Sequence, residues 1–488
     1  MNKRPNIIIF NPDQFRSEAL GHLGNTAAVT PNLDAVCKTD GVSFKNAYCQ
    51  NPVCTPSRCS FMSGWYPHVR GHRTMFNMMQ PDEPVLLKRL KEEGYYVWWG
   101  GKNDLVPAQN SFEPYCTKKH KLTDKVRPSN YANQSWRGKM GDDTFYSFFA
   151  GKLEKGEEEY YHDSDWDHVL AAVDLIKSPP SDQPLCIYLP IEYPHPPYGV
   201  EDPWYSLIDR EKISDPISTP ENWNEKPSIL KGLYENYGMQ GWTKERWIEL
   251  KATYYGMCSR VDYQFGLIVE ALKEADMYDN TAIFFFSDHG DFTGDYGLVE
   301  KTQNTFEDVL TNVPFIIKPP KSFDVDPRVS DALVELVDFS ATVEAMLGIK
   351  SEFTSFGKSL LPVIAGEMDT HRDAVFCEGG RLHDELHCME LNSLGAYDKS
   401  QMYWPRLSLQ VSEGSEHSKA VMLRTQDYKY VYRMYEKHEL YDLLRDPKEL
   451  NNEIDNQEYD EVLATLRSRL LQFFMETGDV VPYKMDKR

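Results

Sequence analysis

The chain has 488 residues, 41% of them apolar and 26% charged, a composition that excludes a chain disordered as a whole. Its 53 basic and 75 acidic residues give a net charge of −22, so we expect neither nucleic acid nor a membrane among its partners. Any anionic substrate must be held by a few local cations. The length suits roughly two to four domains, or one large domain with an appendage.

The N-terminal residues lead directly into an apolar strand. Residues 1–5 contain neither an apolar signal segment nor a cleavage site of small residues. The longest apolar stretches have the length of strands, far below the ~20 residues that span a membrane. We therefore expect a cytoplasmic protein; an exported protein whose signal segment has been removed is the alternative. The nine cysteines include no C-x-x-C pair, which favours neither a disulfide scaffold nor a zinc site.

Continuous apolar runs predict strands buried on both faces of a parallel sheet. These runs are Asn6–Phe10, Tyr95–Trp99, Leu185–Leu189, Ala282–Phe286 and Phe315–Lys318. Helices are predicted at Val85–Glu93, Asp165–Ile176 and about Lys244–Ala275. The alternation predicts an α/β fold in which helices sandwich a large, mostly parallel sheet. Open sheets of this kind place their chemistry beyond the carboxyl ends of the strands.

The pattern changes after about residue 370. Val421–Arg424 and Lys429–Arg433 predict antiparallel strands, and Tyr459–Thr477 predicts an amphipathic helix. We therefore expect a large domain over residues 1–370 and a smaller α+β domain over residues 371–488. Three irregular stretches are candidates for loops that enclose a substrate, or are ordinary surface insertions. They lie at about 105–160, 196–243 and 380–418.

The segment Cys54–Arg58, with the sequence CTPSR, is the most specific feature of the chain. Pro56 suits the first turn of a helix, and Gly64 suits its C-terminal end. Cys54 is therefore expected at a helix N-terminus, where the dipole and free N–H groups lower the pKa of a thiol and attract anions. A lone cysteine in this position is more often a buried structural residue.

The segment resembles the C-x-P-S-R signature of the type I, formylglycine-dependent sulfatases, a family of the alkaline-phosphatase-like superfamily. Other segments are similar to further elements of that family, in the same order along nearly the whole chain. They are Asn6–Gln14, Thr30–Asp34, Gly94–Lys102, Pro194–Tyr198, Thr281–Gly290, Gly297–Lys301 and Glu439–Pro447. The resemblance implies a sulfuric ester hydrolase (sulfatase), and we expect a small sulfated carbohydrate as its substrate.

The resemblance also implies the roles of five catalytic residues. In the family, a maturation enzyme converts the motif cysteine, here Cys54, to formylglycine. The aldehyde hydrate attacks sulfur and later expels sulfate. Arg58 holds the modified side chain. Lys102 and Lys301 bind sulfate oxygens, and His195 protonates the leaving alkoxide.

Two pairs of neighbouring residues match the positions of the family's metal ligands. Asp13 with Gln14, and Asp288 with His289, imply one divalent ion, with the modified Cys54 as a further ligand. Oxygen-rich ligation favours calcium, while one imidazole and one amide make manganese the alternative. The family usually has a second aspartate where Gln14 stands, and asparagine or histidine where His289 stands.

Asp104 departs from the family pattern, because a histidine that contacts the formylglycine hydroxyl commonly stands there. An aspartate accepts the hydroxyl proton, repels an anionic substrate, or recognises a cationic or hydroxyl-rich leaving group. Arg381 and His383, with His387, form a basic spot that is a candidate contact for a uronate carboxylate, or simply a solvated loop. The alternative functions are a phosphonate or phosphate ester hydrolase of the same superfamily and a catalytically silent, metal-dependent binding protein. Oligomeric state stays open.

Overall fold

The computed structural model describes most of the chain. It covers residues 4–128, 134–180, 182–351, 353–390, 398–410, 414–483, 485 and 487–488. The expectation about the first three residues falls outside the described residues. So do the parts of the irregular stretches at 129–133, 391–397 and 411–413. Among the described helices, none is both long and apolar enough to cross a membrane.

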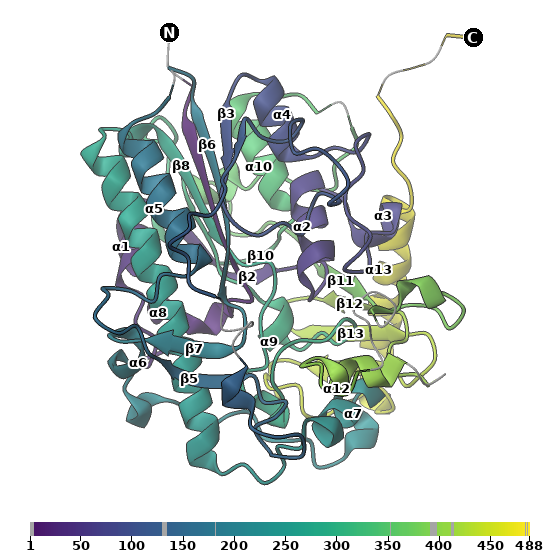
Figure 1. Ribbon diagram of the computed structural model, residues 1–488. Coiled ribbons are helices and arrows are strands. Elements are labelled where there is room, and N and C mark those ends of the chain that lie inside the picture. Colours follow the sequence, from purple (N-terminus) through teal and green to yellow (C-terminus); the bar gives the residue numbers. More distant parts are fainter. Residues whose placement is uncertain are drawn as a thin grey trace.

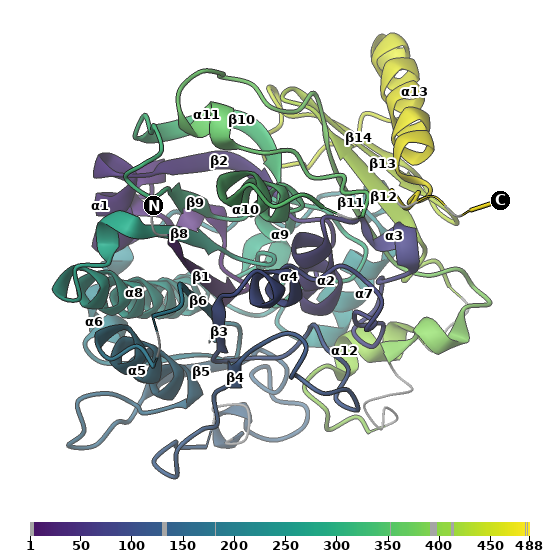
Figure 2. The ribbon, with the colours of Figure 1, turned by 90° about the horizontal axis from the view of Figure 1, so that it is seen from above.

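An eight-stranded sheet forms the centre of the molecule (Figures 1 and 2). Its order is β10-β2-β9-β8-β1-β6-β3-β4, and all neighbours are parallel except β9, which is antiparallel to β2 and β8. The strands are β1 (Asn6–Asp13), β2 (Val42–Tyr48), β3 (Tyr96–Trp99), β4 (Lys118–Lys119), β6 (Leu185–Pro194), β8 (Thr281–Phe286), β9 (Phe315–Lys318) and β10 (Arg328–Glu335). The predicted mostly parallel sheet is confirmed.

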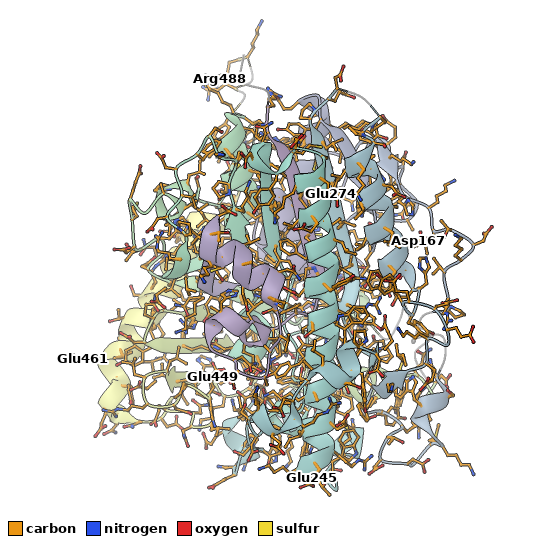
Figure 3. All side chains as sticks on the ribbon, turned by 90° about the vertical axis from the view of Figure 1, so that its left-hand side faces the viewer. Asp167, Glu245, Glu274, Glu449, Glu461 and Arg488 are labelled. Atoms are coloured by element: carbon orange, nitrogen blue, oxygen red, sulfur yellow. The ribbon has the colours of Figure 1, made fainter. Side chains whose placement is uncertain are left out.

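Helices cover both faces of this sheet, which explains why its central strands are continuously apolar. In β1, Ile8 and Phe10 pack into one core cluster, whereas Ile7 and Ile9 pack into the other. Helices α1, α5 and α8 lie on the first face and α2, α4 and α10 on the second (Figure 1). Figure 3 shows α8 running nearly the length of the molecule. The bounds are α1 (Pro31–Thr39), α2 (Cys54–Ser63), α4 (Leu86–Glu92), α5 (Ser164–Lys177), α8 (Lys244–Glu274) and α10 (Asp338–Leu347).

The second sheet belongs to a separate C-terminal domain, as predicted. Its order is β11-β12-β13-β14, all antiparallel, and α13 packs on it (Figure 2). Phe376 of the sheet stacks on Phe473 of the helix at a ring-centroid distance of 3.8 Å. Lys429 of the sheet donates to Asp308 at 2.6 Å, a contact that ties this domain to the segment after β8. The bounds are β11 (Val375–Gly379), β12 (Ala420–Arg424), β13 (Tyr428–Arg433), β14 (Glu439–Asp442) and α13 (Asp460–Thr477).

Short elements occupy the irregular stretches and the connections between the main elements. Strands β5 and β7 form a separate two-stranded parallel sheet. The bounds are β5 (Phe149–Leu153), β7 (Tyr198–Glu201), α3 (Pro67–Arg70), α6 (Trp204–Leu207), α7 (Ser228–Tyr237), α9 (Asp308–Thr311), α11 (Leu361–Ile364) and α12 (Trp404–Leu407).

Helix α2 begins at Cys54 and ends at Ser63, as its sequence predicts. Gly64 follows in the left-handed region with φ 74°, and its N–H donates to the carbonyl of Ser60. A Cβ at Gly64 would lie 2.3 Å from Oγ of Ser355. Both the backbone and the packing therefore require glycine at this position.

We expect Gly64→Ala to lower stability by more than the roughly 1–3 kcal/mol that a left-handed non-glycine residue costs, because the new methyl group also meets Ser355. Gly71→Ala is the matched control. Gly71 ends α3 with φ 79°, and a Cβ there meets nothing within 4 Å. Thermal unfolding of both variants measures the difference. Equal losses of stability would show that the packing around Gly64 adjusts freely.

Candidate active site

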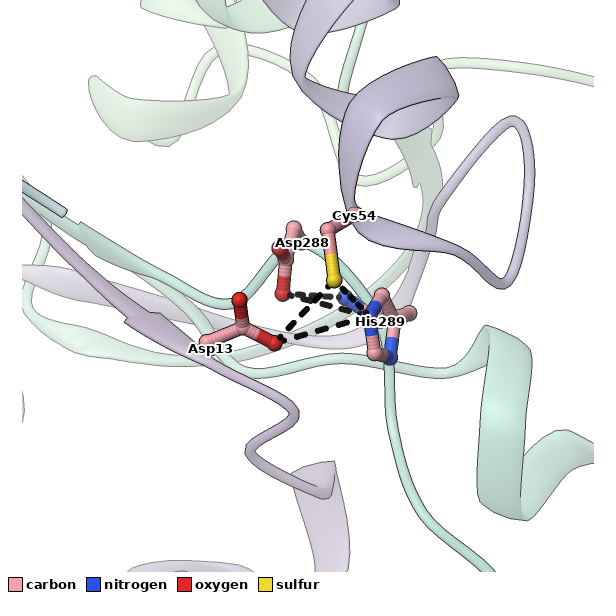
Figure 4. A group of neighbouring side chains, drawn as sticks. All are labelled: Asp13, Cys54, Asp288 and His289. Atoms are coloured by element: carbon pink, nitrogen blue, oxygen red, sulfur yellow. Dashed lines mark hydrogen bonds and ion pairs between the residues drawn. The ribbon is translucent and has the colours of Figure 1, made fainter. Parts of the chain in front are cut away.

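The ends of two neighbouring strands and the start of one helix converge on a single buried point. Asp13 ends β1, and Asp288 and His289 follow β8, which is the parallel neighbour of β1. Helix α2 directs Cys54 toward them (Figure 4). One ligand atom of each of these four residues lies within 4.8 Å of all the others, and all four residues are buried. Cys54 Sγ is 3.5 Å from Asp13 Oδ1 and 3.2 Å from His289 Nε2.

The chemistry of this donor set fits a divalent ion. Nδ1 of His289 lies 2.9 Å from the carbonyl oxygen of Gly290, which can only accept a hydrogen bond, so Nδ1 carries the ring proton. Nε2 therefore has a free lone pair, and it faces the two carboxylates. Burial lowers the pKa of His289, which favours the neutral imidazole that metals bind. Two carboxylates and one neutral imidazole suit calcium or manganese.

Gln14 lies beside this group with its side chain in a fixed orientation. Its Oε1 accepts a hydrogen bond from Lys301 Nζ at 2.7 Å, and its Nε2 donates to Asp291. The backbone of Gln14 is left-handed, with φ 69°, and its N–H donates to Asp288. Burial raises the pKa of Asp291 to about 6. Sequence reasoning missed Asp291, although it lies only three residues after Asp288.

Arg58 is fully buried between the two carboxylates. Its guanidinium donates to Asp13 and Asp288, each at 3.0 Å, and to Asn11 at 3.0 Å. Burial opposes the ionisation of Asp13, but Lys102 and Arg58 hold its pKa well below the usual range. We expected Arg58 to hold the modified Cys54 side chain. In the structure, with Cys54 unmodified, it binds the two carboxylates that flank this residue.

The thiol of Cys54 is not activated by its position at the helix N-terminus. Burial, and secondly the charge of Asp13, raise the pKa of Cys54 well above its ordinary value. Removal from water and a neighbouring carboxylate thus oppose the lowering of this pKa that the helix N-terminus predicts. A protonated thiol is a poor nucleophile, so the unmodified side chain is unsuited to attack.

Lys102 reaches Cys54 from the end of β3. Its Nζ lies 2.6 Å from Asp13 Oδ2 and 3.6 Å from Cys54 Sγ. Asp104 is 3.0 Å from the same ammonium group and 3.7 Å from Arg58 Nε. The aspartate at the family's histidine position therefore pairs with two cations of the site.

Lys301 and His195 lie side by side near the same point. Lys301 Nζ is 3.0 Å from His195 Nε2 and 2.7 Å from Glu300 Oε1. His195 Nδ1 is 2.6 Å from the carbonyl of Pro196, so the ring proton sits on Nδ1 and Nε2 accepts from the lysine. Burial, and then Lys301, hold the pKa of His195 well below its usual value. The imidazole is therefore neutral here.

These groups open into a cavity of about 370 Å³. Its lining residues are Cys54, Met75, Phe76, Lys102, Asp104, Asp163, Glu192, Tyr193, His195, Pro196, Pro197, Glu300, Lys301, Glu390, Tyr403 and Arg406. The candidate loop at 380–418 supplies Glu390, Tyr403 and Arg406, and the loop at 196–243 supplies Pro196 and Pro197. The loop at 105–160 supplies none of the described lining residues.

The structure does not bring the candidate substrate contacts Arg381 and His383 to this cavity. The Arg381 guanidinium donates to the backbone carbonyls of Leu382 and His383, and the His383 ring stacks on Tyr435 at 3.7 Å. A cation that does line the cavity is Arg406, which sequence reasoning missed.

Arg406 donates to Glu300 at 2.5 Å and lies 3.2 Å from Glu390. Glu300 has a left-handed backbone with φ 66°. Burial opposes its ionisation, but Lys301 and Arg406 lower its pKa to about 2. A carboxylate thus joins Arg406 to Lys301. The sequence offers no local signal for the pairing of Arg406 with Glu300, because the two residues lie more than a hundred positions apart.

Known proteins match this chain over nearly its whole length. The sulfatase family model matches residues 5–349, and a model described as N-sulphoglucosamine sulphohydrolase, C-terminal, matches residues 395–476. An arylsulfatase from Clostridium perfringens is 25% identical, over 96% of this chain and 94% of that protein. A choline-sulfatase from Rhizobium meliloti is 26% identical, over 93% of this chain and 83% of that protein.

Solved structures share the fold. The crystal structure of a phosphonate monoester hydrolase of Agrobacterium radiobacter superposes with a TM-score of 0.76 at 20% identity, covering 99% of this chain and all of that one. The family model, the fold and the cluster around Cys54 agree. The chain belongs to the sulfatase family, within the alkaline-phosphatase-like superfamily.

Proposed function

We propose that the protein hydrolyses the sulfate ester of a small sulfated carbohydrate, with the formylglycine derived from Cys54 as the nucleophile. The observation that carries this proposal is the position of Cys54, at the floor of the cavity and within contact distance of Asp13, His289 and Lys102. The carbohydrate is supported by the match of residues 395–476 to a model named for a sulfated amino sugar hydrolase.

Conversion of Cys54 must precede complete folding, because the residue is only 1% exposed in the folded chain. We therefore propose that a formylglycine-generating maturation enzyme meets the chain while α2 is still accessible. The aldehyde then adds water to give a geminal diol. One hydroxyl attacks sulfur as the ester oxygen leaves, and loss of the second hydroxyl proton expels sulfate and restores the aldehyde.

The side chains around Cys54 suit the charges of this reaction. A divalent ion held by Asp13, Gln14, Asp288 and His289 would supply positive charge for the sulfate and lower the pKa of the attacking hydroxyl. Calcium is our first choice and manganese the alternative. Lys102 and Lys301 have their ammonium groups near the nucleophile, where they can bind sulfate oxygens in exchange for contacts to their carboxylate partners.

His195 is suited to meet the leaving oxygen. It is neutral in the free protein, with Nε2 accepting from Lys301. A bound sulfate adds negative charge beside the ring, which raises the pKa of His195 and favours a proton on Nε2. We propose that this proton passes to the leaving alkoxide.

A phosphonate or phosphate ester hydrolase is the second candidate, because the fold is shared with phosphonate monoester hydrolases. Comparing the turnover rates of the p-nitrophenyl esters of sulfate, of a phosphate diester and of phenylphosphonate distinguishes the two. We expect the sulfate to be the best substrate. A protein that turns over none of them, and whose Cys54 stays a thiol when a maturation enzyme is present, would instead fit the catalytically silent alternative.

We expect Cys54 to lose its sulfur and gain an aldehyde oxygen when the chain is produced with a maturation enzyme. Intact mass and peptide mapping measure this change, and Cys59, on the same helix and equally buried, should remain a thiol in the same maps. Cys54→Ala should be inactive. An active enzyme whose Cys54 is uniformly a thiol would refute the mechanism.

We expect chelation to abolish activity and lower the melting temperature, since the carboxylates of Asp13 and Asp288 then lose a counter-charge. Adding calcium or manganese should restore stability by about 2.7 kcal/mol at a hundredfold excess over Kd. Asp288→Asn should lose most of this response, whereas the exposed Asp331→Asn should keep it. Elemental analysis identifies the ion. Full activity of a metal-free sample would contradict the proposed site.

The loss caused by His195→Ala should depend on the leaving group. A sugar alkoxide needs a proton to leave, so we expect its sulfate to lose on the order of 10²–10⁴-fold in rate. p-Nitrophenyl sulfate should lose much less, because nitrophenolate leaves unassisted. Lys102→Ala and Lys301→Ala should slow both substrates alike. Values of kcat/KM for the three variants test this, and equal losses for His195→Ala would assign that residue to sulfate positioning only.

A further inference from the structure

The cavity contains a carboxylate, Glu192, that forms no ion pair with the described cations around it. The other charged lining residues have partners of opposite charge: Lys102 with Asp104, Asp163 with Arg260, Lys301 with Glu300, and Arg406 with Glu300 and Glu390. Glu192 forms no ion pair within the described part of the chain, and its side chain is exposed to the cavity. Its charge is therefore available to a ligand.

The backbone around Glu192 is held firmly beside His195. The N–H groups of Glu192 and Tyr193 each donate to Asp165 at 2.8 Å, and the His195 N–H donates to the Glu192 carbonyl at 2.9 Å. His195 is the residue that we place at the leaving oxygen. Glu192, three residues earlier in the chain, lines the same cavity, and we place it toward the leaving group because its backbone is bonded to that of His195.

The surroundings of Glu192 favour positive charge. Partial desolvation beside the cavity wall, and the charges of Asp163, Asp13 and Asp104, raise the pKa of Glu192 despite the opposing effect of Lys102. Desolvation disfavours a charge of either sign, but the carboxylates of Asp163 and Asp104 favour a cation in the same place. Phe76 also lines the cavity and is 47% exposed, so it presents an aromatic face of the kind that attracts cations.

We propose that Glu192 selects a leaving group that carries a positively charged nitrogen close to the sulfated hydroxyl. This inference rests on the proposed function and narrows its substrate class. The ammonium group of an amino sugar and the quaternary ammonium group of a small amino alcohol share the required chemistry. A leaving group with a carboxylate or a second sulfate would instead meet the uncompensated charge of Glu192, at an energetic cost.

Two matched pairs of substrates test the proposal. Choline O-sulfate is compared with 3,3-dimethylbutyl sulfate, which has the same shape without the charge. Glucosamine 3-sulfate, whose ammonium group is on the carbon next to the sulfated one, is compared with glucose 3-sulfate. We expect kcat/KM to be about 10-fold or more higher for the cationic member of at least one pair, as a charged contact of this kind gives. The pair that shows the preference identifies the source of the cation.

The variants separate charge recognition from a structural effect. Glu192→Gln keeps the size and hydrogen-bonding capacity of the side chain, and we expect the ratio of kcat/KM within the preferred pair to fall toward one. Glu192→Lys should reverse that ratio. Glu461→Gln is the matched control, since Glu461 is exposed on α13 and lines no part of the cavity (Figure 3), and it should keep the wild-type ratio.

Two results would overturn the inference. One is equal kcat/KM within both pairs for the wild-type enzyme. The other is a preference for the cation that survives in Glu192→Gln. In either case, turnover of p-nitrophenyl sulfate would still support the proposed sulfatase function. If p-nitrophenyl sulfate and all four substrates are inert with a fully converted Cys54, the proposed function fails first, and the inference fails with it.

Discussion

The ion pairs of Arg58 with Asp13 and Asp288 are the constraint on which the rest of the site depends. Parallel neighbouring strands end at the same edge of the sheet, so the two carboxylates meet there without water around them. Two buried carboxylates repel each other unless a cation lies between them. Arg58 is four residues after Cys54 and hence on the same face of α2. Helix α2 thus brings both Cys54 and the positive charge that balances the two carboxylates.

The parts of the fold that follow from local sequence patterns were predictable. Strands β1, β6 and β8 are continuous apolar runs because helices cover both faces, and their polar ends hold most of the proposed site. Strands β2 and β10 escaped prediction. Near one edge of the sheet, β2 exposes Lys45, and β10 exposes Val329 and Asp331, so neither reads as a buried run.

The outer cavity was not predictable, because its residues meet only through the tertiary fold. Glu300 and Arg406 lie far apart in the sequence yet share an ion pair. Arg381 and His383 were chosen because they are close together in the sequence, but backbone carbonyls occupy the Arg381 guanidinium. The burial and the Asp13 charge that raise the pKa of Cys54 also come from the rest of the chain, and its position at a helix N-terminus gives no sign of them.

The residues of the cavity wall are of two kinds. Some belong to the chain of ion pairs from Arg406 through Glu300 to Lys301, and others do not. Replacing Arg406 or Glu390 disturbs a charge network that ends on Lys301, the residue that we propose binds the sulfate, so a gain in substrate range there should carry a loss of rate. Glu192 and Phe76 line the same space without joining that network. We therefore expect substrate preference in proteins with this fold to diverge at the positions of Glu192 and Phe76. A substitution at either position leaves the chain of ion pairs intact.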